Sequence, residues 1–145
     1  MPLYRTVKRV YNKEIERKGG RAMRPTESRE DYLETILLLN QETGYVRSID
    51  VAERLGVTKP SVSRATSLLK EARLLEMDPR DGALTLTEAG QALAEQVYER
   101  HRTLTRLLEK IGVSSETAAQ DACRIEHVIS EESMTTIRNF LEGQA

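Results

Sequence analysis

The chain has 145 residues, of which 31% are charged and 39% hydrophobic, as in a soluble globular protein with one compact domain or two small ones. Aromatic residues make up only 4% and tryptophan is absent, so the core is expected to be aliphatic. The longest apolar run, residues 36–39, is too short to cross a bilayer, and no signal peptide is visible. A single cysteine excludes an internal disulfide and fits a reducing cytoplasm, so we expect a cytoplasmic protein without a membrane partner.

The formal net charge of −1 is unevenly distributed along the chain. Residues 1–22 hold seven Lys or Arg and two acidic residues, a balance of +5, so residues 23–145 carry −6. An acidic body excludes general adhesion to nucleic acid, and DNA binding would need a local surface. Residues 1–22 are interpreted as a basic arm that touches phosphates or as a disordered tail. A third hypothesis is that Met23 is the true start, with Lys-Gly-Gly at residues 18–20 encoded by a ribosome-binding sequence read in frame.

A first helix is predicted over residues 28–42, with Ser28 as its cap and Gly44 at its end. Asp31 and Glu34 are three residues apart and therefore project from one side of this helix. Acidic residues also favour the first turn of a helix, so a purely structural role stays open for both of them. The apolar stripe consists of Tyr32, Leu33, Ile36, Leu37 and Leu39.

Residues 47–72 predict a helix-turn-helix. Ser48 is expected to cap a helix through Leu55, Gly56 to make the turn, and Thr58 to cap a second helix with Pro60 in its first turn. The residues expected to face inward are Ile49, Ala52, Leu55, Val62, Ala65, Leu68 and Leu69. The outer face of the second helix is short, polar and basic, and consists of Lys59, Ser61, Ser63, Arg64, Ser67 and Lys70.

Residues 74–77 and 83–86 predict two short strands joined by a turn at residues 79–82. A hairpin directly after a helix-turn-helix is a wing, which favours DNA binding over an ordinary helical hairpin with a solvated face. Small polar residues and Arg can approach base edges in the major groove, whereas Lys and Arg elsewhere position the protein on phosphates. The predicted DNA-binding residues are Lys59, Pro60, Ser61, Ser63, Arg64, Ser67, Lys70 and, at the tip of the wing, Arg80. One such unit buries little surface, so a two-fold dimer on a palindromic operator is expected.

The second half of the chain predicts three further helices. A long helix over residues 87–111 is capped by Thr87, ends at Gly112 and has an apolar stripe of Leu93, Val97, Leu104, Leu108 and Ile111. His101 falls on this stripe, where a core histidine bonded to a carbonyl is the alternative to a functional role. Ser114 is expected to cap a helix through about His127. Residues 130–133 are then expected to interrupt the helix before an amphipathic helix marked by Met134, Ile137, Phe140 and Leu141.

Cys123, Glu126 and His127 would share one face if this stretch were helical, because their spacing is i, i+3 and i+4. A thiolate, a carboxylate and an imidazole together suit a divalent transition metal better than Ca²⁺ or Mg²⁺. The alternative is that Cys123 is a buried core thiol and that Glu126 and His127 are solvated.

In these residues the chain resembles the diphtheria-toxin-repressor/manganese-transport-regulator family of metal-dependent bacterial repressors, over about residues 27–142. The resemblance implies a mainly α fold, with a winged helix-turn-helix DNA-binding domain at residues 23–86. It also implies a helical metal-binding dimerisation domain at residues 87–145. The matching stretches are residues 30–36, 49–62, 84–90, 100–101, 121–127 and 129–132.

The metal ligands implied by the resemblance are Asp31, Glu34, His101, Cys123, Glu126 and His127. Asp31 and Glu34 match the manganese branch of the family, whereas Cys123 matches the iron branch, so the set is mixed. The expected cofactor is Mn²⁺ or Fe²⁺, with Co²⁺ or Zn²⁺ able to replace it in vitro. Whether one or two ions bind each subunit stays open.

The function implied is a repressor of metal-ion uptake genes that is activated for operator binding by Mn²⁺ or Fe²⁺. The alternative is a winged-helix regulator that responds to an organic ligand or to oxidation of Cys123. An enzyme is not expected, because the sequence contains no nucleophile-and-base arrangement and no glycine-rich phosphate loop.

Overall fold

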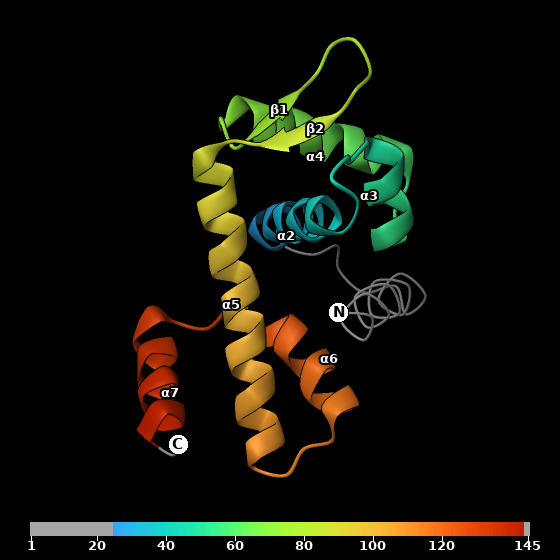
Figure 1. The fold of residues 1–145 in the computed structure, drawn as a ribbon. Coiled ribbons are helices and arrows are strands. Elements are labelled where there is room, and N and C mark those ends of the chain that lie inside the picture. Colours follow the sequence, from blue (N-terminus) through green and yellow to red (C-terminus); the bar gives the residue numbers. More distant parts are fainter. Residues whose placement is uncertain (1–24, 144–145) are drawn as a thin grey trace.

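The computed structural model describes residues 25–143 of the chain. Within them, three helices and a hairpin form a head, and one long helix leads from this head to two further helices (Figure 1). We call the long helix and these two further helices together the body. This mainly helical architecture, with a winged helix-turn-helix first, agrees with the fold class predicted from the sequence. The elements are α2 (Pro25–Thr43), α3 (Ser48–Leu55), α4 (Lys59–Glu71), β1 (Leu75–Met77), β2 (Leu84–Leu86), α5 (Glu88–Lys110), α6 (Ser115–Ile125) and α7 (Glu131–Gly143).

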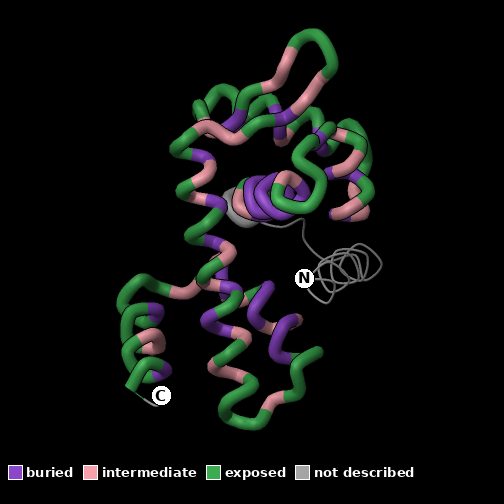
Figure 2. The backbone as a smooth tube through the Cα atoms, in the orientation of Figure 1, coloured by how far each residue is buried: buried purple, intermediate pink, exposed green. Residues whose placement is uncertain are grey.

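Helix α2 lies at the centre of the head, and Figure 2 shows much of it buried. Every residue from 31 to 39 is buried, because α3, α4, β2 and α5 all pack against this helix. The helix begins at Pro25, which the first turn tolerates, so the predicted start and cap at Ser28 are wrong. Burial on all sides places Asp31 and Glu34 in the interior, where an uncompensated carboxylate is strongly destabilising.

Helices α3 and α4 form the predicted helix-turn-helix. The N-cap of α3 is Arg47, whose N–H donates to the Asp50 carboxylate at 2.9 Å, so the expected cap at Ser48 is wrong. Gly56 turns the chain with a φ of 70°, which glycine adopts without steric cost. Thr58 caps α4 as predicted, because its hydroxyl accepts from a first-turn N–H at 3.3 Å.

Two inward positions predicted in this unit are wrong. Ile49 and Leu68 are 45% and 55% exposed, and Val51 and Thr66 are buried in the same helices. Thr66 can be buried because its hydroxyl donates to the Ser63 carbonyl at 3.0 Å. The other inward residues are buried or partly buried as predicted: Ala52, Leu55, Val62, Ala65 and Leu69.

The wing is an antiparallel hairpin in which β1 pairs with β2 and Leu75 lies opposite Leu86. Each strand is one residue shorter than predicted, and the turn ends at Gly82 with a φ of 75°. The Leu84 N–H donates to the Val46 carbonyl at 2.8 Å, which attaches the hairpin to the loop between α2 and α3. The wing is therefore held by the head at its base and projects at its tip, as Figure 1 shows.

Helix α5 starts where the body is joined to the hairpin. Thr87 caps it as predicted, accepting from the Gly90 N–H at 3.1 Å and donating to the Arg73 carbonyl at 2.8 Å. A Cβ at Gly90 would collide with the Leu74 carbonyl oxygen, so only glycine allows the backbones to approach this closely. The direction in which α5 leaves the head is thus fixed by local contacts.

Helix α6 is capped by Ser114 as predicted, with the Thr117 N–H donating to its hydroxyl at 3.4 Å. The helix ends at Ile125, so the expectation that it continues through His127 is wrong. Glu126 is the C-cap residue, and a turn follows before α7. The residues after Cys123 therefore do not share one helical face.

Helix α7 packs on α5, and its Met134 and Leu141 are buried as the amphipathic pattern predicts. Met134 shares a buried cluster with Leu104 of α5. Phe140 is 48% exposed and Ile111, the C-cap residue of α5, is 66% exposed, so the inward positions predicted for these two are wrong. Ile111 lies beyond the last turn of its helix, and Phe140 lies outside the cluster that contains Met134. Among the helices of residues 25–143, none has the length and apolar character needed to cross a membrane.

Candidate metal centre and DNA-reading surface

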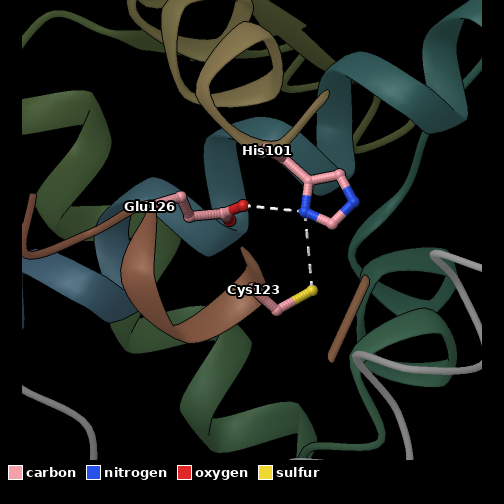
Figure 3. Close-up of side chains that lie close together, drawn as sticks. All are labelled: His101, Cys123 and Glu126. Atoms are coloured by element: carbon pink, nitrogen blue, oxygen red, sulfur yellow. Dashed lines mark hydrogen bonds and ion pairs between the residues drawn. The ribbon is translucent and has the colours of Figure 1, made fainter. Parts of the chain in front are cut away.

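Three buried side chains from the body lie close together in Figure 3. His101 comes from the middle of α5 and Cys123 from the last turn of α6, and Glu126 is the C-cap residue of α6. His101 Nδ1 lies 2.9 Å from Glu126 Oε2 and 3.7 Å from Cys123 Sγ. Each of these residues is at most 2% exposed, and together they form the first ligand group.

A second ligand group joins the body to the head. His127 Nε2 lies 3.1 Å from Asp31 Oδ1 on α2 and 3.2 Å from Glu126 Oε1. Glu126 therefore belongs to both groups, with one carboxylate oxygen facing each histidine. Because α6 ends at Ile125, the backbone turn sends Cys123 and His127 to different neighbours.

The distances within both groups fit a divalent transition ion. Such an ion lies about 2.0–2.2 Å from nitrogen and oxygen ligands, so neighbouring ligand atoms are separated by roughly 3 Å. The nitrogen–oxygen separations here are 2.9, 3.1 and 3.2 Å, and the longer sulfur–nitrogen distance agrees with longer metal–thiolate bonds. Imidazole, carboxylate and thiolate donors suit Mn²⁺, Fe²⁺, Co²⁺ or Zn²⁺.

The burial of these carboxylates distinguishes this cluster from an ordinary apolar core. Asp31 is 3% exposed and Glu126 is fully buried, and such carboxylates are retained where they are paired or coordinate a cation. His101 does lie on the apolar stripe of α5, but its Nδ1 faces a carboxylate and a thiol. Cys123 is indeed a buried thiol, and it also packs with Leu38 where α2 meets α6. The alternative that Glu126 and His127 are solvated is wrong, because their side chains are 0% and 2% exposed. The alternatives for Cys123 and His101 describe their burial but not their neighbours.

Not every predicted ligand is brought together. Glu34 is fully buried on α2, one helical turn beyond Asp31, yet it is in neither ligand group. Conversely, Glu30 was not singled out as a site residue, and its Oε2 lies 2.8 Å from His127 Nδ1. Its position directly before Asp31 carries no spacing signal, and only the fold reveals this contact.

The predicted DNA-binding residues all lie on the surface. The predicted DNA-binding residues of α4 are all exposed, whereas Val62, Thr66 and Leu69 are buried. At the wing, the side chain of Arg80 is 88% exposed and hydrogen-bonds Asp78 through two nitrogens, at 3.1 and 3.3 Å. These side-chain bonds, followed by the bond that the Arg80 backbone N–H donates to Asp78 Oδ1 at 2.9 Å, lower the pKa of the Asp78 carboxyl below its ordinary value. The exposed set is Lys59, Pro60, Ser61, Ser63, Arg64, Ser67, Lys70 and Arg80.

Two family models match almost all of the described chain. Residues 25–83 match the N-terminal DNA-binding domain of iron-dependent repressors, and residues 87–143 match the metal-binding and dimerisation domain of the same repressors. The transcriptional regulator MntR of Escherichia coli O157:H7 is 38% identical over 144 residues, covering 97% of this chain and 92% of that protein.

Solved structures give the same result. The crystal structure of IdeR from T. acidophilum superimposes with a TM-score of 0.69 at 31% identity, over 78% of this chain and 53% of that one. A manganese-dependent transcriptional repressor in complex with manganese superimposes with a TM-score of 0.69 at 30% identity, over 79% of this chain and 52% of that one. The chain thus spans about half the length of these solved structures.

A winged helix-turn-helix joined to a helical body through buried side chains that could hold a metal ion defines a metal-dependent, DNA-binding transcriptional regulator. The chain belongs to the iron-dependent repressor family, in which the diphtheria-toxin repressor and the manganese-transport regulator are grouped. The resemblance inferred from the sequence is thereby confirmed.

Proposed function

We propose that this chain is a cytoplasmic repressor of metal-ion uptake genes, activated for operator binding by Mn²⁺ or Fe²⁺. The observation that carries the proposal is that His127 Nε2 lies 3.1 Å from Asp31 Oδ1 of α2 and 3.2 Å from Glu126 Oε1, so that possible ligand atoms of α2 and of the end of α6 meet at one point. The names of the matched relative and of the manganese complex support the choice of metal.

We assign the ligands as two groups that share Glu126. The first would use His101 and Cys123, and the second would use Asp31 and His127. The thiolate favours Fe²⁺, Co²⁺ or Zn²⁺, and the hard carboxylates favour Mn²⁺ or Fe²⁺. Glu34 is the weakest candidate, because its carboxylate lies outside both groups.

The proposed switch acts across the contact between head and body. Asp31 and Glu126 both place a carboxylate oxygen beside His127 Nε2, so their negative charges face one another. A bound divalent cation supplies the positive charge that these carboxylates share. With Asp31 held against the end of α6, α2 is fixed relative to the body, and α3 and α4 pack directly on α2. A coupling of about 1–3 kcal/mol between metal and DNA would suffice for a useful switch.

On DNA, we propose a two-fold dimer that reads a palindromic operator, with the body at residues 87–145 pairing the subunits. The N-terminal half of α4 would enter the major groove, where Ser61, Ser63 and Arg64 can reach base edges. Lys59, Lys70 and Arg80 would contact phosphates and fix the position of the head. The head would comprise residues 23–86. Residues 1–22, interpreted from the sequence as a basic arm, a disordered tail or a stretch before the true start, lie outside the described residues.

The experiment is a titration of fluorescent operator DNA with the protein in chelator and in Mn²⁺, Fe²⁺, Co²⁺ and Zn²⁺. Activation by about 1–3 kcal/mol predicts that Mn²⁺ or Fe²⁺ raises operator affinity roughly 5- to 150-fold over the chelated protein. Cys123→Glu should shift the preference toward Mn²⁺, and Cys123→Ala should weaken the response to Zn²⁺ and Co²⁺. An operator affinity that is the same with chelator and with every metal would refute the proposal.

The alternative of a cysteine-oxidation sensor fits the structure less well. Cys123 is 2% exposed, whereas redox-sensing cysteines are accessible to the oxidant. Peroxide treatment of the protein kept metal-free by a chelator distinguishes activation by metal from sensing by cysteine oxidation. We expect it to leave operator affinity unchanged, and an oxidant-dependent change reversed by a thiol reductant would favour the alternative.

A further inference from the structure

Both ring nitrogens of His127 face carboxylates of helix α2. Nε2 lies 3.1 Å from Asp31 Oδ1, and Nδ1, on the other side of the ring, lies 2.8 Å from Glu30 Oε2. The side chain of His127 is 2% exposed and that of Glu30 is 13% exposed, so water has little access to this contact. Two adjacent residues of α2 therefore hold the same imidazole from opposite edges.

The two edges have different chemical roles. A neutral imidazole carries one N–H, and a nitrogen that binds a metal must offer its lone pair. His127 Nε2 is the nitrogen that belongs to a ligand group, beside Asp31 and Glu126. Metal binding there requires the ring proton to be on Nδ1, and Glu30 supplies an acceptor at hydrogen-bond distance from that atom.

We propose, building on the metal-dependent function above, that Glu30 is a positioning residue that holds His127 in its metal-binding tautomer and orientation. The carboxylate accepts the Nδ1 proton and makes Nε2 a stronger donor toward the metal. Glu30 is not itself a ligand, because it faces the ring edge directed away from Asp31 and Glu126. It also ties the end of α6 to α2 next to the site where the cation would join them.

The test compares Glu30→Ala, Glu30→Gln and Glu53→Ala in the full chain. The Gln carbonyl oxygen can still accept the Nδ1 proton, Ala cannot, and Glu53 is an exposed carboxylate on α3 that serves as the control. Mn²⁺ affinity would be measured by titration, and the ¹⁵N shifts of the His127 ring would be recorded on the Zn²⁺-loaded protein. Melting of the metal-free proteins shows whether each variant folds.

We expect Glu30→Ala to bind Mn²⁺ about 10- to 100-fold more weakly, as is typical for a lost partner of a ligating histidine. Glu30→Gln should stay within a few-fold of the wild type and keep the ring signals of a protonated Nδ1 and a metal-bound Nε2. Glu53→Ala should be unchanged. If the wild type binds Mn²⁺ and Glu30→Ala binds it equally well, or if Gln and Ala lose affinity alike, this inference is wrong and the proposed function stands. If the wild type binds no metal, both fail.

Discussion

Glu126 is the single residue on which both ligand groups depend. Its Oε2 lies 2.9 Å from His101 and its Oε1 lies 3.2 Å from His127, and the side chain is fully buried. A carboxylate that uses both oxygens can hold one cation in either group or bridge two. Removal of Cys123 would affect one group, whereas removal of Glu126 would affect both.

This difference predicts the effect of Glu126→Gln. The amide keeps the size of the side chain but removes its charge, so Mn²⁺ affinity should fall at least about 100-fold, the upper end of the range for outer ligand partners. Cys123→Ala should lose less, because Asp31, Glu126 and His127 remain. Calorimetric titration measures both, with circular dichroism as a check on folding. A larger loss in Cys123→Ala than in Glu126→Gln would contradict the assignment of Glu126 as the shared ligand.

The structure gathers five of the six residues predicted as ligands into two groups, but not in the arrangement that the sequence predicted. The spacing of Cys123, Glu126 and His127 indicated a shared face only on the assumption that the helix continues. The helix ends at Ile125, so the three side chains divide between two groups. Glu30 could not be found by spacing, because its role depends on His127, which is 97 residues away in the chain.

Helix α4 illustrates what a single element contributes. Its exposed face offers short polar side chains and basic ones, and its buried face carries Val62 and Leu69 into the core of the head. Short side chains let the helix backbone approach base edges, and the longer basic ones reach phosphates. The two kinds of contact have different signatures in solution.

Arg64→Ala and Lys70→Ala should therefore weaken DNA binding in different ways. Loss of Arg64 is expected to cost about 1–3 kcal/mol of discrimination between the operator and a variant operator. Loss of Lys70 should weaken binding to every sequence and reduce the slope of log K against log salt by about 1. Fluorescence anisotropy at several salt concentrations measures both effects. Equal losses on operator and unrelated DNA in Arg64→Ala would contradict a base-reading role.

At the scale of elements, three of the five predicted caps are confirmed, whereas those at Ser28 and Ser48 are wrong, and most but not all inward positions are confirmed. The caps Thr58, Thr87 and Ser114 were predicted correctly, because a cap is a contact between near neighbours in sequence. Ile49 and Leu68 were placed inside by periodicity and are exposed, because the partners that surround a helix decide which arc is buried. Pattern alone does not contain those partners.

The molecule as a whole is organised around α2, which is at once the core of the head and the carrier of Asp31. The sequence predicted one apolar stripe on this helix, but residues 31–39 are buried on every side. Elements from far along the chain, including α4 and α5, produce that burial. No local rule relates positions nearly a hundred residues apart. The pairing of Asp31 with the end of α6 was therefore implied only by family resemblance.

The central claim is that a cation joins α2 to the end of α6 and so sets the head relative to the body. A crystal structure grown with Mn²⁺, with anomalous scattering to locate the metal, tests it most directly. The account predicts a manganese peak about 2.0–2.3 Å from oxygens of Asp31 and Glu126 and from His127 Nε2. A metal-loaded crystal in which these three side chains point apart, with no anomalous peak between them, would contradict it.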